Sequence, residues 1–422
     1  AQPKPPPEAQ PKPAAQPKPA AAAAQPKPTA SVNEVFDGGP NADVFNKLLE
    51  KHKKLQSDML SGRVPLSRAI IARCSAHDVC AGLGDRIFGI IVLYLGAILT
   101  DRAFFVDYSK PKPMEESLEP NRFEWRLSAI KDATVRQNMM ACATGQGSLP
   151  GCNFINLLMP GAQCPHVIGS VFNDKPFVVI NSDHRTECVQ KLLVKIGVVP
   201  AKGQNGFAAT PEAMRWWAAN VSHILLNTLF RFRPEVVQAG DKMLTPPGAT
   251  APISSDCFMC VHVRSGSGVG ERGRHTNFQD FASCGLTAYN ERLAKASTCP
   301  KIRPWLIVGD NSAAPKQIGK YANKGRGEND KFTILDTTNL GPPTHVDQNN
   351  RATGDMVRHV FVDWYLLSRC RYFVASLSTF GGTASIFSGP RTYRYDMEVG
   401  GHSGGCSHHR ISDWQRDANI PG

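Results

Sequence analysis

Several common sequence features are missing from this chain of 422 residues, and each absence removes a class of protein. The longest apolar run, residues 87–99, is shorter than the roughly 20 residues that a membrane-spanning helix needs, and it fits a buried helix better. The chain has neither the paired CxxC motifs of a structural zinc site nor the GxxxxGK[ST] loop that cradles nucleotide phosphates. It also lacks a basic and aromatic nucleic-acid-binding module, so nucleic acid is not an expected partner.

The composition is that of a globular protein with a substantial core. Apolar residues make up 41% of the chain and charged residues 20%, and the length is sufficient for two domains of ordinary size. The formal net charge of +12 is spread along the chain, which raises the potential around an anionic ligand without requiring one.

Most of the twelve cysteines are expected to form disulfides in an oxidising compartment, with a pairing that the sequence does not define. Cys257 and Cys260 form one CxxC motif, but they fall in an expected strand, where side chains three residues apart point to opposite faces. The single glycosylation sequon at Asn220 agrees with a secretory route.

Residues 1–30 repeat Ala-Gln-Pro-Lys-Pro four times, which predicts an extended, solvated segment without a core. We expect residues 1–40 to be a disordered stalk between a membrane or cell wall and a catalytic head; a featureless tail is the alternative. The chain opens on Ala rather than Met, which leaves room for a preceding leader or membrane anchor.

The rest of the chain alternates between apolar strands and helices, as doubly wound parallel sheets do. In the first half, a glycine turn at residues 82–86 joins a strand to a helix, as in a βαβ unit, and an irregular, disulfide-tied layer is expected over residues 110–210. We predict two Rossmann-like α/β domains, 41–235 and 236–422, that face a cleft. The expected strands are 69–74, 103–107, 257–264, 304–310, 332–336 and 371–375; the expected helices are 87–100, 210–230, 284–297, 314–323, 353–370 and one opening at 378–379.

The strand at residues 257–264 ends in His262-Val-Arg264 and runs into a glycine-rich loop. Open α/β sheets bind ligands at the carboxyl ends of their strands, and the planar fork of an arginine suits a diphosphate. The turn Ser376–Gly382 likewise follows a strand and opens a helix, where free N–H groups and hydroxyls can bind an anion. The alternatives are a buried strand with a terminal arginine and ordinary capping by serine or threonine.

Asp355, His359 and Asp363 recur at every fourth position of the expected helix 353–370, so they share one face. A charged surface stripe would explain this spacing. Asp363, however, lies among Val362, Trp364 and other apolar residues. If it is buried, its carboxylate could accept hydrogen bonds from the N1–H and 2-amino groups of guanine.

Three segments together resemble fucosyltransferases that use GDP-fucose. His262-Val-Arg264, followed by Val269-Gly-Glu271 and His275, is similar to their donor-site signature. Residues 362–379 resemble the helix, strand and Ser-Ser/Thr turn of the core α1,6- and nodulation-type enzymes. Ser378-Thr-Phe-Gly381 resembles the plant cell-wall α1,2-fucosyltransferases, as does Gly82-Leu-Gly-Asp-Arg86 with the segment that follows to Asp107.

The resemblance implies a GT-B fold, an inverting transfer and a GDP-fucose donor without a required metal or other cofactor. By position, Arg264 would hold the β-phosphate, with Ser378 and Thr379 completing the cradle, and His262 and Asp363 would recognise guanine.

Glu271 would be the general base that takes the proton of the acceptor hydroxyl. Gly82 and Gly84 would let their loop approach the donor, with Asp85 and Arg86 at its tip. Two departures leave room for another GDP-sugar: Ser267 stands where the family has an acidic residue, and the His262–Glu271 spacing is one residue shorter than in the α1,6 type.

We therefore expect a glycosyltransferase that moves fucose to a hydroxyl of a glycan or glycoprotein, either anchored in the Golgi lumen as a type II membrane protein or secreted. Two alternatives stay open: the same fold with another GDP-sugar, and a non-catalytic cell-wall or surface protein that binds glycans. The presence of Arg264, Glu271, Asp363 and Ser378 together favours the enzyme.

Overall fold

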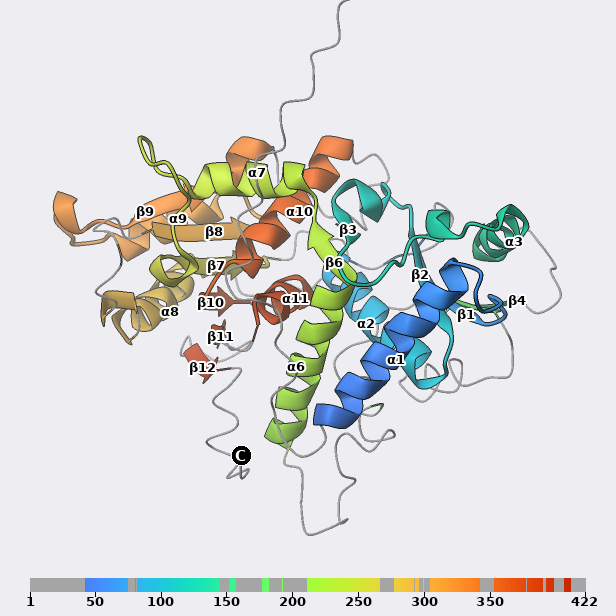
Figure 1. Ribbon diagram of the computed structural model, residues 1–422. Helices are drawn as coiled ribbons and strands as arrows, with labels where there is room; N and C mark the ends of the chain where they lie inside the picture. The colour runs from blue at the N-terminus through green and yellow to red at the C-terminus, as the bar shows by residue number, and fades with distance from the viewer. Residues whose placement is uncertain are drawn as a thin grey trace, which may run out of the picture. The chain divides into compact units, whose positions relative to one another are not determined.

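Two parallel sheets and the helices that cover them make up the described part of the chain (Figure 1). The computed structural model describes residues 42–74, 80, 82–144, 152–156, 177–181, 192, 211–265, 277–291, 293–295, 299, 304–341, 353–376, 378–389, 392–397 and 406–410. The predicted stalk lies outside these residues, and the predicted domain boundary near residue 235 stays a prediction.

The first sheet has four parallel strands in the order β2-β1-β5-β4. Strand β1 (Ala69–Cys74) and strand β2 (Ala103–Tyr108) are joined by α2 (Leu83–Leu99), which confirms the βαβ unit. The other two strands are β4 (Cys152–Asn156) and β5 (Phe177–Asn181), and α3 (Ala133–Thr144) precedes them. The expectation of an irregular layer over residues 110–210 is therefore wrong for these segments, because five-residue strands between long connections carry little periodic signal.

Helix α2 is apolar and buried over almost its whole length, as a helix surrounded by other elements must be. It packs against β1, α1 (Ala42–Leu60), α6 (Pro211–Leu229) and α11 (Thr379–Ser388). It begins at Leu83 rather than at residue 87, so most of the predicted glycine turn is its first helical turn. Gly84 there meets a packing constraint rather than a turn.

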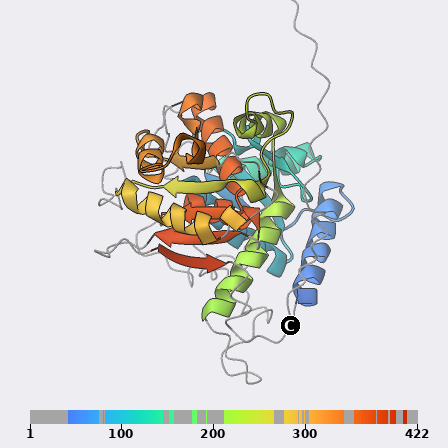
Figure 2. The same ribbon diagram turned by 90° about the vertical axis from the view of Figure 1, so that its left-hand side faces the viewer.

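The second sheet has six strands in the order β12-β11-β10-β7-β8-β9, all parallel except β12. In Figure 2, the yellow β7 lies between the orange β8 and the red β10. The strands are β7 (Met259–Val263), β8 (Pro304–Gly309), β9 (Thr333–Asp336), β10 (Tyr372–Ala375), β11 (Tyr393–Met397) and β12 (Cys406–Arg410).

Helices cover both faces of this sheet. The core around α8 (Phe278–Glu291) and α9 (Ala314–Ala322) includes Val261 and Trp305 from one face, and the core around α10 (Gly354–Ser368) and α11 includes Cys260 and Leu306 from the other. Helix α8 begins six residues before the predicted start. The mixed α/β architecture agrees with the sequence prediction.

The chain order of this sheet creates a topological switch point. From β7 the chain moves outward through β8 to β9, and α10 then returns it to β10 on the other side of β7. The carboxyl ends of β7 and β10 lie side by side, with His262 paired in register to Ala375. In open α/β sheets, such a point is where ligands bind.

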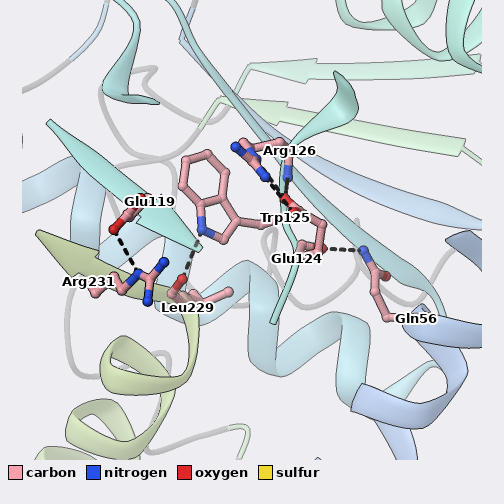
Figure 3. Close-up of polar contacts among 7 residues, drawn as sticks. All are labelled: Gln56, Glu119, Glu124, Trp125, Arg126, Leu229 and Arg231. Carbon is pink, nitrogen blue, oxygen red and sulfur yellow. Dashed lines mark hydrogen bonds and ion pairs between the residues drawn. The ribbon is translucent and has the colours of Figure 1, made fainter. Parts of the chain in front are cut away.

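A third, two-stranded sheet pairs the segment that follows β2 with the segment between α6 and α7 (Pro234–Leu244). Strand β3 (Leu118–Pro120) pairs with β6 (Phe230–Phe232), and Arg231 forms an ion pair with Glu119 at 2.8 Å (Figure 3). The indole Nε1 of Trp125 donates to the Leu229 carbonyl at 2.9 Å.

The edge strand β2 is covered by the side chain of Gln56 and by the segment around Trp125. The Gln56 amide donates to the Glu124 carbonyl (Figure 3). It also donates to the Phe104 carbonyl, and its oxygen accepts from Phe104 N. The Trp125 carbonyl accepts from Val106 N at 3.0 Å. Phe104 and the Val106 N–H are thus paired on this edge, which limits its ability to pair with another chain.

Four disulfides join described cysteines, which confirms the prediction that the cysteines are mostly paired. They are Cys74–Cys80, Cys257–Cys299, Cys260–Cys370 and Cys284–Cys406. The two cysteines of the CxxC motif therefore pair with distant partners and not with each other. Within the described ranges, no helix combines the length and apolar character that crossing a membrane requires.

Candidate functional site

Polar groups from three strand ends converge at the switch point of the second sheet. Ser376, which follows β10, connects to both residues of the His-x-Arg motif at the end of β7. Its hydroxyl accepts from the backbone N–H of Arg264 at 2.9 Å, and its own N–H donates to the His262 carbonyl at 3.0 Å. The two strand ends are therefore fixed relative to each other by backbone and hydroxyl contacts.

Arg264 is buried, with its side chain 9% exposed, and Asp310 from the end of β8 orients it. The Arg264 Nη1 and the Asp310 Oδ2 lie 3.0 Å apart. The other carboxylate oxygen of Asp310 accepts from both the N–H and the hydroxyl of Ser265, at 2.8 and 2.7 Å. A buried guanidinium held by a carboxylate keeps its direction, which is a requirement for a preorganised anion site.

The imidazole of His262 lies beneath the first turn of α11. Its ring centroid is 5.6 Å from that of Phe380, and a Cβ on Gly381 would lie 2.9 Å from its Nδ1. Burial lowers the pKa of His262 to about 4, so the ring is neutral at physiological pH. The Ser376 hydroxyl lies 3.4 Å from Nδ1 and can donate its proton there, which would leave the Nε2 as the protonated nitrogen.

The N-terminus of α11 follows β10 and carries two of the predicted phosphate ligands. Ser378 occupies the N-cap position, but its hydroxyl makes no capping hydrogen bond, so the alternative of ordinary capping is not realised. Thr379 is the first residue of the helix, and both side chains are partly exposed. The first-turn N–H groups of a helix carry partial positive charge and favour an anion.

The first turns of α2 and α11 meet at Gly84. A Cβ on this residue would lie 2.3 Å from both Phe380 N and the carbonyl carbon of Thr379, closer than real side chains approach a backbone. Only glycine permits this contact without displacement of one helix. The structure thereby brings the predicted glycine segment directly against the predicted Ser-Thr turn.

The other two residues of the α2 turn differ in exposure. Asp85 is partly exposed, whereas Arg86 is buried and its Nη1 donates to the Lys110 carbonyl at 2.6 Å. Burial lowers the pKa of Arg86 to about 10, which leaves it cationic at neutral pH. Gly82 stands at the N-cap of α2, where no side chain makes a capping hydrogen bond.

The charged face of α10 divides into an exposed and a buried part. Asp355 is exposed and pairs with Arg358, whereas His359 and Asp363 are buried, with 5% and 9% of their surface exposed. The His359 Nε2 and the Asp363 Oδ1 are 3.5 Å apart, and neither has a hydrogen-bond partner among the described residues. A buried carboxylate without a close donor is costly unless something supplies one, so Asp363 fits a ligand contact better than a surface charge.

The structure also adds residues that sequence reasoning did not assign to the site. Ser376 contacts the Arg264 backbone, Asp310 contacts its side chain and Ser265 donates to Asp310, and each of the three lies at the end of a strand. In the sequence, the feature that could have located them is a polar residue shortly after each buried strand. Glu271, the predicted base, lies outside the described residues, as do His275 and Ser267. Among the residues that are described, no group of three or more His, Cys, Asp or Glu side chains could hold a metal ion.

The chain matches no protein-family model, and no curated protein matches it in sequence. Solved structures do match in fold. A point mutant of Arabidopsis thaliana FUT1 in complex with GDP superposes with a TM-score of 0.52 at 14% identity, over 86% of this chain and 82% of that one. POFUT1 in complex with GDP-fucose matches with a TM-score of 0.37 at 11% identity, over 77% of this chain and 94% of that one. This chain thus has an α/β fold of the GT-B type found in fucosyltransferases, as the sequence resemblance implies.

Proposed function

We propose that this chain is an inverting glycosyltransferase that transfers fucose from GDP-fucose to a hydroxyl of a glycan or glycoprotein. One observation supports this most: a buried, oriented arginine and an uncapped helix N-terminus meet at the switch point of a sheet. Both groups favour a diphosphate, and the fold is similar to that of a GDP-bound FUT1.

In this proposal, the donor diphosphate lies between β7 and α11. Arg264 binds the β-phosphate, and Asp310 fixes the direction of its guanidinium. Ser378 and Thr379 contribute hydroxyls, and the first N–H groups of α11 add partial positive charge. These groups stabilise the negative charge that develops on GDP as it leaves, so the reaction needs no metal for that step.

The base of the nucleotide would lie against α10. The Asp363 carboxylate would accept hydrogen bonds from the N1–H and 2-amino groups of guanine, which its Oδ1 lacks within the described residues. Adenine presents no such pair of donors on its Watson–Crick edge, so this contact would select guanine. The neutral His262 braces the Ser376 turn, and its own contact with guanine stays a prediction.

The transfer itself is a displacement at the anomeric carbon of fucose. The acceptor oxygen forms its bond on the face opposite GDP while the bond from the anomeric carbon to the β-phosphate oxygen breaks, which inverts the configuration. Glu271 takes the proton from the acceptor hydroxyl, as a carboxylate base within hydrogen-bond reach would.

The disulfides support an oxidising compartment, and we propose the Golgi lumen or the cell exterior. Residues 1–40 would act as a stalk, residues 41–235 as the acceptor-side domain and residues 236–422 as the GDP-sugar-binding domain. Gly82, Gly84, Asp85 and Arg86 would approach the donor from the acceptor side.

The test is turnover with defined donors. GDP release would be measured with GDP-fucose, GDP-mannose and UDP-galactose, each with and without a mixture of glycan acceptors, and the product would be identified by mass spectrometry. Fucosylated product from GDP-fucose alone supports the proposal. Product from another GDP-sugar would reassign the donor, and GDP binding without turnover would favour a non-catalytic binder.

Asp363→Asn offers a sharper test of the base contact. The amide replaces one acceptor oxygen with a donor, which would face the donors of guanine. We expect GDP affinity to fall about tenfold or more, in line with the loss of a charged hydrogen bond, while ADP affinity stays as it was. An unchanged preference for GDP over ADP would remove Asp363 from the proposed base site.

A further inference from the structure

A buried hydrogen bond joins α10 to α11 next to the candidate site. The indole Nε1 of Trp364 donates to the Thr383 hydroxyl at 3.2 Å, and that hydroxyl donates to the Phe380 carbonyl at 3.0 Å. Trp364 and Thr383 are both fully buried. The two bonds satisfy the indole N–H and the hydroxyl proton, so neither donor is left unpaired in the core.

Aromatic rings pack around the indole that makes this bond. The centroid of the Trp364 ring lies 5.3 Å from that of Phe232 and 5.2 Å from that of Phe387, which belongs to α11. Apolar contacts have no preferred direction, so by themselves they let one helix slide along the other. A hydrogen bond has a narrow range of length and angle, and it therefore sets the position of α11 along α10.

Each end of the bond lies beside a residue proposed for the donor site. Trp364 directly follows Asp363, the residue proposed to contact guanine. Thr383 bonds to the carbonyl of Phe380, which directly follows the phosphate cradle formed by Ser378 and Thr379. The bond therefore connects the helix proposed for the base with the helix end proposed for the diphosphate.

The spacing between these two contacts must match one molecule. The guanine and the diphosphate of GDP are joined through a ribose, so both contacts form together only when they lie at the right distance from each other. In enzymes, a misplacement of about 1 Å can cost about 100-fold in rate. A shift of α11 along α10 would change this spacing and leave each contact intact by itself.

We infer that the hydrogen bond from Trp364 to Thr383 sets the spacing between the base contact on α10 and the phosphate cradle on α11, and that Thr383 is a positioning residue for the nucleotide. The inference rests on the proposed function, because it takes guanine at Asp363 and the diphosphate at α11 as given. It adds the contact that makes the two halves of the site fit a single ligand.

The experiment compares the whole ligand with its anionic part. The full chain would be titrated calorimetrically with GDP and with inorganic pyrophosphate, as wild type, Thr383→Val and Thr383→Ser. Valine keeps the branched shape of threonine without the hydroxyl, whereas serine keeps the hydroxyl. Ser368→Ala is the matched control, because the Ser368 hydroxyl also donates to the carbonyl three residues before it, at 2.7 Å, within its own helix.

In Thr383→Val, GDP affinity should fall about tenfold, because the two contacts no longer fit one ligand, while pyrophosphate affinity stays within about twofold. Thr383→Ser and Ser368→Ala should keep the wild-type affinity for GDP. Trp364→Phe removes the same bond from its other end and should give the same loss, with no further loss in the double variant. If thermal unfolding shows that Thr383→Val does not fold, Trp364→Phe gives the answer.

Wild-type GDP affinity in the variants that lack the bond would overturn the inference. An equal loss of GDP and pyrophosphate affinity would also overturn it, because the cradle alone would then be damaged, and so would the same loss in Ser368→Ala. Failure of the proposed function appears in the wild type itself, as an absence of GDP binding, and it would overturn the inference as well. A wild type that binds GDP beside variants that bind it equally well refutes the positioning role alone.

Discussion

Replacement of Gly84 by alanine tests whether α2 and α11 form one rigid support for the site. The added Cβ would lie 2.3 Å from Phe380 N, whereas ordinary contacts are about 3.5–4 Å, so one helix must move by more than about 1 Å. Overpacking of this kind costs typically about 1–3 kcal/mol. Alanine recovers about 1 kcal/mol through its higher helix propensity. Because the atoms that clash are backbone, the cost lies at the upper end, and we expect a net loss of about 2 kcal/mol.

The same displacement moves the Ser378–Thr379 turn, so GDP affinity should fall about tenfold together with stability. Urea unfolding and calorimetric titration with GDP measure the two effects. Gly327→Ala is the matched control, because a Cβ there would meet no atom within 4 Å, and it should change neither quantity. Wild-type stability and GDP affinity in Gly84→Ala would refute the close packing of the two helix ends.

Four further outcomes are expected. Arg264→Lys keeps the charge beside Asp310 but loses the planar fork, so GDP affinity should fall about tenfold or more by calorimetry; unchanged affinity would remove the phosphate role. Glu271→Gln should lower turnover by about 10²- to 10⁴-fold with GDP still bound, and normal turnover would exclude Glu271 as the base. Turnover should persist in EDTA, and its loss there would contradict a metal-free transfer. Burial lowers the pKa of His52 and His262 from 6.5 to about 4. Between pH 6.5 and pH 4 the unfolded chain therefore binds more protons than the folded chain, so the free energy of unfolding falls as the pH is lowered through this range. Each histidine accounts for a loss of up to about 3 kcal/mol in the free energy of unfolding. A thermal unfolding temperature that stays constant between pH 7 and pH 4.5 would contradict this.

The strands of the second sheet were predictable because each is a short apolar run bounded by polar or turn residues. The predicted strand 304–310 corresponds to β8 (Pro304–Gly309), and 371–375 to β10 (Tyr372–Ala375). Strand β5 was not predicted, although Phe177–Asn181 is apolar, because its flanking segments showed no helix that would mark a βαβ unit.

The role of Gly84 could not be read from the sequence in the same way. A glycine pair before an apolar run indicates a turn, yet here Gly84 lies inside the helix. Glycine is required at this position because α11, almost 300 residues later in the chain, contacts it. Helix propensity alone disfavours glycine at this position, and the tertiary contact outweighs it.

Part of the candidate site was also predictable. The positions of Arg264 and Ser378 follow from strand ends and helix starts, which periodicity locates. The ion pair with Asp310 and the hydrogen bond from Arg264 N to Ser376 depend on which strands are neighbours, and sheet order is not encoded in any local pattern.

The most direct test of the central claim is a calorimetric titration of the intact chain with GDP, ADP and UDP in buffer that contains EDTA. The roles proposed for Arg264, Asp363 and the α11 N-terminus predict binding of GDP and little or none of the other two nucleotides. Equal binding of all three would contradict the proposed base contact. Absence of binding to any of them would contradict a nucleotide-sugar site at the switch point.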